Sequence, residues 1–276
     1  VERYEAEARD HGMVFDARPF VIGGYAQMLK EVLEQAEAGE RPDGLIAYAP
    51  VEPGTVELLT KISKLGVSVV LVDGDRPHTG RLGATVAGYS EAGSLMAEQA
   101  ANLLPGVPGA KKILLLAGDP CTDSHADVAR AFHAYFDERG LDYAVRDLYG
   151  AHKQIDELRE KVEALLSDAD APGLVCSVFA VGSEAVADAV MELGLVGKIC
   201  VIASGLFPEN VIAMRRGIFT NIVYKDPIAL AYCGARMLGE YLLRGEMPAE
   251  SVLRGGAGLV FRSNLDQYCR LEGVEV

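Results

Sequence analysis

Short apolar runs rich in β-branched residues alternate with amphipathic segments along almost the whole chain. The runs that we predict to be strands occupy residues 44–50, 67–73, 112–118, 173–180, 198–204 and 219–224. They are continuously apolar rather than alternating, which is typical of parallel strands covered on both faces. Repeated strand–helix–strand units of this kind predict an α/β fold with open parallel sheets and right-handed crossovers.

The segments between these runs have helical periodicity. Leu29, Val32, Leu33 and Ala36 recur with the spacing of one helix face, and similar patterns follow most of the predicted strands. We expect several of these helices to end at glycine-containing turns, namely those of Gly39, Gly66 and Gly140. A stretch rich in proline and glycine, residues 103–112, is either a simple surface loop or lies close to a passage from one α/β lobe to another.

Bulk properties limit the function classes. The 276 residues suffice for one large domain or two ordinary ones, and the formal net charge of −14 argues against a nucleic-acid-binding surface on this segment. Because no apolar run approaches roughly 18 residues, we expect no membrane partner. The five cysteines are scattered and odd in number, which favours reduced thiols and a cytoplasmic location.

Polar residues gather where the predicted strands end, which is where open α/β sheets bind ligands. No nucleophile elbow, phosphate-binding loop, dinucleotide fingerprint or zinc spacing is present, so we expect no enzyme, metal or cofactor. His125 lies four residues after Cys121, a spacing that we attribute to coincidence. Asp73 and Asp75 precede Arg76 in a turn, where we expect a hydrogen-bonding corner rather than paired catalytic acids.

Six motifs follow one another along the chain, and their order matters for a family resemblance. They are "RPDGLIAYAP", "GVSVVLVDGDRP", "TVAGYSEAG", "KKILLLAGDPCTDSHADVARAFHAYFDERGL", "KICVIASGLFPENV" and "GIFTNIVYKDPIALAYCGARML". From about residue 20 to its C-terminus, the chain resembles the effector-binding region of LacI/GalR-type transcription regulators. Close structural relatives of that region are the periplasmic sugar-binding proteins.

The resemblance implies two Rossmann-like lobes with parallel sheets, joined by three crossovers, and a ligand held between them. We expect residues 1–95 with 226–250 in the N-terminal lobe, and residues 96–225 with 251–276 in the C-terminal lobe. Residues 219–224 would end in a crossover at Lys225 and Asp226, and Pro227 would open a helix in the other lobe. The sequence would also begin inside the family's first helix, so a preceding strand and a DNA-binding headpiece would lie outside it.

The chain departs from the family's ligand-binding residues. Lys225 replaces a glutamine, and Gly205, Ala126 and Gly182-Ser183 replace other polar residues that the family uses. A cleft that loses these groups has changed its ligand, and Lys225 and Arg76 would suit a carboxylate or phosphate, although both could instead form a closing salt bridge. The residues that we expect to bind ligand are Asp73, Asp75, Arg76, Thr122, Ser124, His125, Phe179, Ser204 and Lys225.

The leading hypothesis is therefore the effector domain of a cytoplasmic, dimeric LacI-type regulator. It would bind a sugar or a sugar derivative, possibly acidic, and change operator DNA binding allosterically through a headpiece outside this sequence. The alternative is an extracytoplasmic solute-binding protein of a sugar ABC transporter, because the two classes share a fold. An enzyme on a doubly wound sheet is the third possibility, for which the sequence offers no catalytic group.

Overall fold

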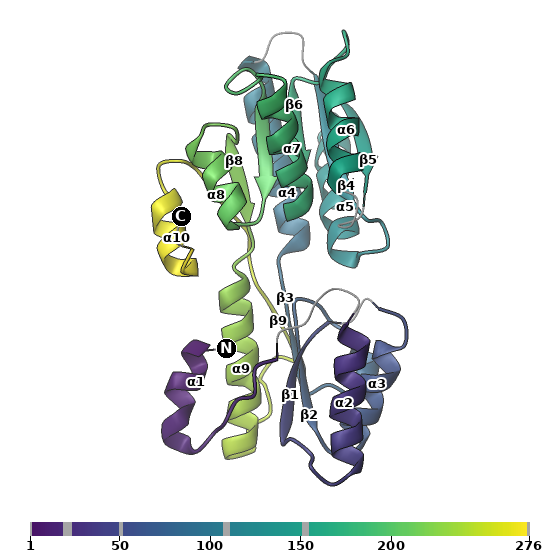
Figure 1. The fold of residues 1–276 in the computed structure, drawn as a ribbon, viewed down its shortest axis with the longest axis vertical. Coiled ribbons are helices and arrows are strands. Elements are labelled where there is room, and N and C mark those ends of the chain that lie inside the picture. Colours follow the sequence, from purple (N-terminus) through teal and green to yellow (C-terminus); the bar gives the residue numbers. More distant parts are fainter. Residues whose placement is uncertain (1, 19–23, 50–51, 107–110, 151–154, 275–276) are drawn as a thin grey trace. The chain divides into compact units, whose positions relative to one another are not determined.

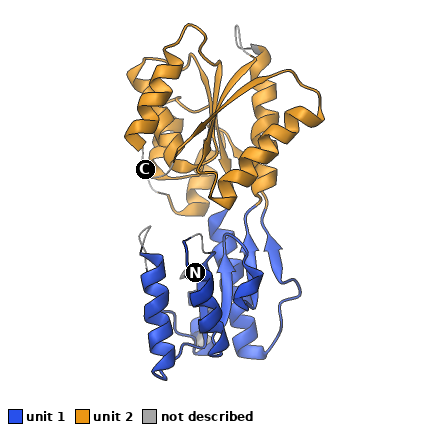
Figure 2. Cartoon of the chain, turned by 90° about the vertical axis from the view of Figure 1, so that its right-hand side faces the viewer, with its two compact units in different colours: residues 1–87, 226–255 blue, residues 88–225, 256–276 orange. Residues whose placement is uncertain are grey.

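The chain is divided between two compact units. The computed structural model describes residues 2–18, 24–49, 52–106, 111–150 and 155–274 (Figure 1). Unit 1 contains residues 1–87 and 226–255, and unit 2 contains residues 88–225 and 256–276 (Figure 2). The backbone therefore passes between the units three times, after Ala87, Lys225 and Gly255. The expected fold class, two Rossmann-like lobes with three crossovers, is confirmed.

The observed boundaries differ from the expected ones in two places. Residues 88–95 belong to unit 2, because they open a helix that packs within that unit, and residues 251–255 belong to unit 1, because they include a strand of its sheet. The crossover at Lys225 and Asp226 has the expected position. The chain on both sides of residues 103–112 belongs to unit 2, and the nearest passage between the units is the one after Ala87.

Unit 1 contains a four-stranded parallel sheet with the order β1-β2-β3-β9. Its strands are β1 (Gly44–Tyr48), β2 (Ser68–Val72), β3 (Gly83–Val86) and β9 (Val252–Arg254). Its helices are α1 (Glu2–Ala8), η1 (Arg9–His11), α2 (Tyr25–Glu37), α3 (Thr55–Lys64), η2 (Pro77–Thr79) and α9 (Pro227–Arg244).

Strand β2 shows why this unit has three layers. Val69 and Leu71 are fully buried in a cluster with residues of α2 and α3, whereas Val70 between them packs with Met237 and Leu238 of α9. Since successive side chains of a strand point to opposite faces, helices must cover the sheet on both sides. This two-sided burial explains the continuously apolar sequence of the strand.

Unit 2 contains a six-stranded sheet with the order β10-β8-β7-β6-β4-β5, in which only β10 is antiparallel to its neighbour. Its strands are β4 (Lys112–Gly118), β5 (Ala144–Tyr149), β6 (Leu174–Ser177), β7 (Cys200–Ser204), β8 (Asn221–Tyr224) and β10 (Gly258–Val260). Its helices are α4 (Tyr89–Leu103), η3 (Leu104–Gly106), α5 (Asp123–Glu138), α6 (Ile155–Leu166), α7 (Ala180–Glu192), α8 (Pro208–Arg215) and α10 (Leu265–Glu272).

Helices cover both faces of this sheet, as the orange unit in Figure 2 shows. Helix α4 packs against α5, and α6 packs against α7. Gly93 permits the close approach of α4 and α5, because a Cβ at this position would lie 2.2 Å from the carbonyl oxygen of Val128. The "GYSEAG" motif thus serves two local purposes. Gly88 precedes the first turn of α4, and Gly93 allows the next helix to pack on it.

Four strands escaped prediction: β3, β5, β9 and β10. Strands β9 and β10 have only three residues each, too few to show a pattern, and the four-residue strand β3 begins with a glycine and has no longer apolar run around it. Strand β5 is an edge strand whose side chains alternate, with Arg146 facing one side and Asp147 the other. The predicted run 173–180 is also too long at its end, because the strand stops at Ser177 and α7 begins at Ala180.

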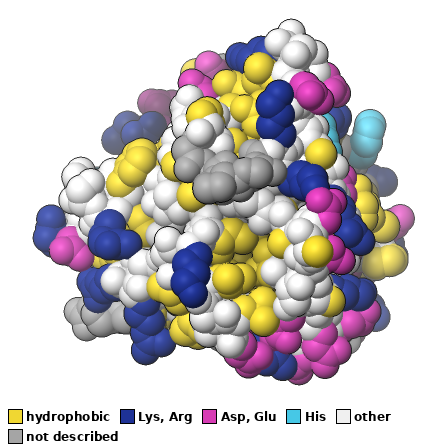
Figure 3. Space-filling model, turned by 90° about the horizontal axis from the view of Figure 1, so that it is seen from above, with side chains coloured by type: hydrophobic (Ala, Val, Ile, Leu, Met, Phe, Trp, Pro, Cys, Tyr) yellow, Lys and Arg dark blue, Asp and Glu magenta, His cyan; other side chains and the backbone are white. Residues whose placement is uncertain are grey.

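Two properties of the described residues bear on membrane and nucleic-acid binding: the apolar character of the helices and the distribution of charge on one face. No described helix combines the length and apolar character that crossing a bilayer requires. On the face in Figure 3, Lys and Arg side chains alternate with acidic and hydrophobic ones and do not form one basic stripe.

An ionisable pair joins the edge strand β5 to helix α5. Nε2 of His133 lies 2.9 Å from one carboxylate oxygen of Asp147, and the Tyr149 hydroxyl donates to the other oxygen at 3.1 Å. The His133 side chain is 38% exposed. The hydrogen bond with Asp147 raises the pKa of His133, partial burial lowers it, and the charges of Asp147 and Asp137 raise it further.

We expect a matching pH dependence of stability. Because the folded pKa of His133 is raised, its contribution to unfolding free energy is fully present below the ordinary value of 6.5 and is lost as pH rises through the folded pKa. Urea denaturation should show H133Q destabilised by up to about 1 kcal/mol at pH 5.5 and by less at pH 8.5. The same substitution in a D147N background should show no such pH dependence. An equal effect at both pH values would contradict the role of the ion pair.

Candidate functional site

Polar groups from four segments meet at the carboxyl edge of the unit 2 sheet. Because β4, β6, β7 and β8 run parallel, the residues that follow them lie along one edge. Of the nine predicted residues, six belong to these segments, and the other three lie in unit 1. The six are Thr122, Ser124 and His125 after β4, Phe179 after β6, Ser204 at the end of β7 and Lys225 after β8.

Three serines link these strand ends in what we call the serine network: Ser177, Ser183 and Ser204. The Ser177 and Ser183 hydroxyls both donate to the carbonyl oxygen of Phe179, at 2.9 and 3.1 Å. The Ser183 hydroxyl also accepts the backbone N–H of Ser204 at 3.0 Å. All three serines are buried, so these bonds hold the end of β7 against the first turn of α7 in a water-poor environment.

The serine network explains two departures from the family pattern. At Gly182, a Cβ would lie 2.6 Å from the Ser177 hydroxyl and 2.5 Å from the Phe179 ring, so only glycine fits the present packing. Ser183 is fully buried and bonded within the protein. The Gly182-Ser183 pair therefore stabilises the carboxyl edge of the unit 2 sheet through contacts inside the protein. Ser183 lies outside the predicted ligand set, although its place after a strand was a visible signal.

The Lys225 side chain places a positive charge next to the serine network. Its ammonium group donates to the Ser204 hydroxyl at 3.2 Å and lies 5.7 Å from the centre of the Tyr89 ring, within the range of a cation–π contact. The next residue, Asp226, has a left-handed backbone with φ of 42°, and its carboxylate accepts the N–H of Ala229. Asp226 thereby caps α9, and its backbone turns the chain sharply just after Lys225.

His125 and Phe179 form a buried pair beside the serine network. Their ring centres are 5.0 Å apart, and both side chains are less than a tenth exposed. Nδ1 of His125 accepts the backbone N–H of Asp119 at 3.1 Å, so the neutral ring carries its proton on Nε2. At Gly118, whose φ is 72°, a Cβ would lie 2.5 Å from Nδ1, which makes glycine necessary there as well.

The remaining predicted residues of unit 2 lie in the turn between β4 and α5. Asp119 closes this turn, because its carboxylate accepts the N–H of Cys121 at 2.8 Å and its carbonyl accepts the N–H of Thr122 at 3.0 Å. Thr122 and Ser124 are partly exposed at the start of α5. Cys121 is exposed, whereas the His125 ring is buried and bonded to Asp119.

Phe207 is a further aromatic side chain at this edge that sequence reasoning missed. It follows β7 directly and is 53% exposed, and its ring lies against the backbone of Gly205. Asn210 fixes the turn beneath it, donating to the carbonyl oxygens of Ser204 and Gly205 at 3.1 and 2.9 Å. An exposed aromatic residue immediately before a helix-opening proline was the available signal in "GLFPEN".

The predicted residues of unit 1 lie after β2, at the carboxyl edge of its sheet. The Asp75 carboxylate forms a bidentate ion pair with Arg81, whose Nη2 donates at 2.7 Å. Arg76 instead donates to the Asp75 carbonyl oxygen at 2.8 Å. The expected corner between Asp75 and Arg76 therefore uses the backbone, and the charge partner is six residues away. Asp73 has a left-handed backbone, with φ of 62°.

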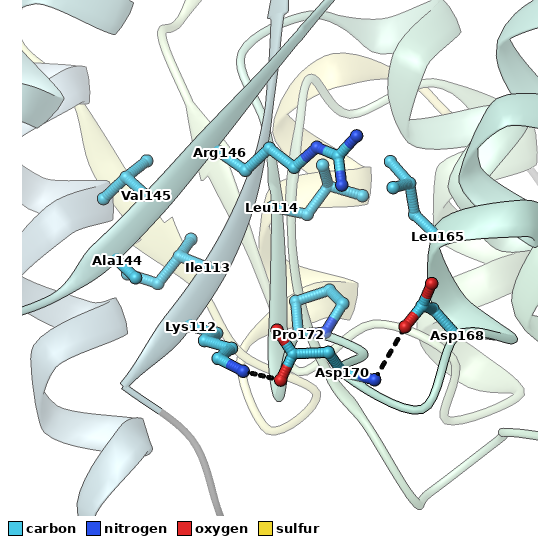
Figure 4. Close-up of a pocket in the computed structure, with 10 residues that line it drawn as sticks. All are labelled: Lys112, Ile113, Leu114, Ala144, Val145, Arg146, Leu165, Asp168, Asp170 and Pro172. Atoms are coloured by element: carbon cyan, nitrogen blue, oxygen red, sulfur yellow. Dashed lines mark hydrogen bonds and ion pairs between the residues drawn. The ribbon is translucent and has the colours of Figure 1, made fainter.

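A cavity of about 300 Å³ lies at the opposite end of the unit 2 sheet (Figure 4). It is bordered by Lys112, the first residue of β4, and by Asp170 in the loop before β6. This cavity contains none of the nine predicted residues. In the described part of the chain, no cluster of His, Cys, Asp or Glu has the arrangement of a metal site.

The comparisons agree with this architecture. The family described as periplasmic binding protein domain matches residues 2–247. No curated protein sequence matches the chain significantly. The family's description and the solved structures compared below refer to binding or regulatory proteins.

Three solved structures illustrate the likeness. A sugar-binding protein of a sugar ABC transporter from Bacillus halodurans has 18% identity and a TM-score of 0.82, with 97% of this chain and 93% of that one covered. An ABC transporter solute-binding protein from Agrobacterium vitis, bound with α-D-tagatopyranose, has 16% identity and a TM-score of 0.79, with 100% and 93% covered. A protein described as a LacI transcriptional regulator from Bacteroides fragilis has 12% identity and a TM-score of 0.74, with 97% and 91% covered. The fold is therefore shared by both classes, and the regulator assignment stays a prediction.

We predict that Ser183 stabilises the folded state of unit 2. In S183A the buried N–H of Ser204 loses its acceptor, which should lower the unfolding free energy by about 1–3 kcal/mol. Urea denaturation measures this loss. The matched control, S167A, removes an exposed hydroxyl at the end of α6 and should change stability by less than about 0.5 kcal/mol. Equal stability of the two variants would contradict the serine network.

Proposed function

Because this chain belongs to the periplasmic binding protein domain family, we propose that it binds a small sugar-class ligand reversibly and serves a sugar ABC transporter as its solute-binding component. Support comes from the two solved transporter proteins, one of which has a sugar bound. The ligand would bind at the carboxyl edge of unit 2, where the predicted residues from four segments meet. Ligand contacts with Asp73 and Arg76 of unit 1 stay predictions, and so does a ligand position between the two lobes.

The contact between Lys225 and the serine network is the observation that carries the proposal. The ammonium group is held by Ser204 and faces the Tyr89 ring, and it is only partly buried. A cation fixed by packing and hydrogen bonds loses little freedom when it binds an anion. The same sheet edge offers an exposed aromatic side chain, Phe207, for the apolar side of a sugar ring.

This arrangement favours an acidic sugar derivative over a neutral hexose or pentose. Neutral sugars are recognised by several buried acceptors and donors that pair with their hydroxyls. Here the Ser183 hydroxyl is bonded within the protein, and the positive charge that faces this part of the unit 2 edge is the Lys225 ammonium group beside Ser204. A carboxylate or phosphate on the ligand would form a charge-assisted hydrogen bond with it.

The effector domain of a LacI-type regulator is the second candidate role. Its support is the ordered set of motifs that ends in "VYKDPIALAY", together with the likeness to one protein described as a LacI regulator. The five unpaired cysteines also suit a reducing compartment. In this role the ligand would act on operator DNA through a headpiece, and the protein would be a cytoplasmic dimer.

We predict that an acidic sugar binds and that Lys225 provides much of its affinity. Isothermal titration should detect binding of at least one member of a panel of gluconate, glucuronate, glucose 6-phosphate and ribose 5-phosphate. Removing one charge-assisted hydrogen bond costs about 1.5–3 kcal/mol, so K225M should weaken this binding by about tenfold or more. The melting temperature of the ligand-free protein should change little, because Lys225 is partly exposed.

The control variant is K198M, which removes an exposed lysine near the amino end of β7 in the same unit. It should retain wild-type affinity. Equal affinity for glucose, galactose or ribose, or an unchanged affinity in K225M, would refute the acidic ligand. Binding of a neutral sugar that depends on Phe207 rather than Lys225 would keep the sugar class and reject the anionic group.

The two candidate roles differ in what precedes Val1 in the gene. A helix-turn-helix segment there would establish the regulator and exclude the transporter component, whereas an export or lipoprotein signal would do the reverse. Sedimentation analysis of the complete protein adds a second criterion, because the regulator requires a dimer to bind a two-fold operator.

A further inference from the structure

We propose that the cavity at the amino ends of β4 and β5 is a second ligand site, which takes a small monocarboxylate with an apolar body. This site, called here the Arg146 cavity, has a volume of about 300 Å³, at the lower end of the range for ligand pockets. It is formed within unit 2 alone, by β4, β5, the end of α6 and the loop that follows α6. The inference does not depend on the proposed function.

Strand register places the key side chains on one face of the sheet. Leu114 of β4 and Arg146 of β5 are directly paired, as are Lys112 and Ala144. Paired residues point to the same side of a sheet, so Leu114 and Arg146 both face α6, while Asp147 faces α5 and His133. Figure 4 shows the Arg146 guanidinium extending over the cavity beside Leu114, with Leu165 of α6 across from it.

The charged side chains around the cavity differ in whether they interact with other groups of the protein. Lys112 forms an ion pair with Asp170, and the Asp168 carboxylate accepts the N–H of Asp170 at 2.8 Å (Figure 4). In the ranges that the structure describes, Arg146 forms no hydrogen bond or ion pair. An arginine with its planar fork of donors directed over an apolar floor matches a carboxylate, which it binds through two parallel hydrogen bonds.

The other walls select the rest of the ligand. Leu114 is almost completely buried, and Leu165 and Pro172 are partly buried, so the floor and one wall are apolar. This surface would contact an aromatic or branched aliphatic body and gain from its burial. Sugars, which need a polar partner for each hydroxyl, are disfavoured. Asp168 and Asp170 at the rim would repel a dianion such as a phosphate monoester more strongly than a singly charged carboxylate.

The test uses ¹⁹F NMR with the full chain and 4-fluorobenzoate as the probe. We expect millimolar or tighter binding of 4-fluorobenzoate, and affinity at least about tenfold weaker for its neutral isostere 4-fluorobenzamide. R146Q should weaken 4-fluorobenzoate binding by about the same factor. R146K keeps the charge but loses the planar fork, so its affinity should lie between those of R146Q and the wild type.

The matched control is R130Q. Arg130 is an exposed arginine of α5 in the same unit, paired with Asp127, and its loss should leave binding unchanged. Because Arg146 is exposed, R146Q should retain the wild-type melting temperature, so a loss of binding can be assigned to the site. Equal binding of the amide, unchanged affinity in R146Q, or no binding at 20 mM probe would each overturn the proposal.

Discussion

Parallel pairing of strands that are buried on both faces is the constraint on which the rest of this structure depends. All five parallel strands of unit 2 end at the same edge, so residues separated by a hundred positions meet there. His125, Phe179, Ser204 and Lys225 come from four different strand ends, and strand direction alone brings them to one edge. The serine network then joins the Phe179 carbonyl to the backbone of Ser204 through buried bonds, and the Ser204 hydroxyl accepts a hydrogen bond from Lys225.

The sequence revealed the parts of the fold that this constraint shapes most strongly. Strands β1, β2, β4, β6, β7 and β8 were predictable because burial on both faces demands unbroken apolar runs. The three-residue strands β9 and β10 were not, because pairing with distant segments stabilises what so few residues could not specify locally, and β3 begins with a glycine and has no longer apolar run around it. Strand β5 was not predicted because it lies at the sheet edge, where exposed and partly buried residues alternate and no continuous apolar run forms.

The candidate site divides in the same way. The sequence showed which residues follow the end of a strand, and the resemblance located the crossover after Lys225 correctly. Partner choice was not readable, because it depends on side-chain geometry. Asp75 pairs with Arg81 rather than with its neighbour Arg76, and Ser183 serves the backbone of Ser204, which is 21 residues away. Phe207 was overlooked because an isolated aromatic residue in a turn has no periodicity to mark it.

The interleaving of the two units has a consequence for biosynthesis. Neither unit is one continuous stretch: unit 1 needs residues 226–255 to supply α9 and β9, after all of β4 to β8 has been made. A ribosome working from the amino end therefore delivers most of the unit 2 sheet before the unit 1 sheet can close. During that interval the apolar surface that α9 later covers, including Val70, stays unshielded, and exposed surface of this kind makes a nascent chain prone to aggregation.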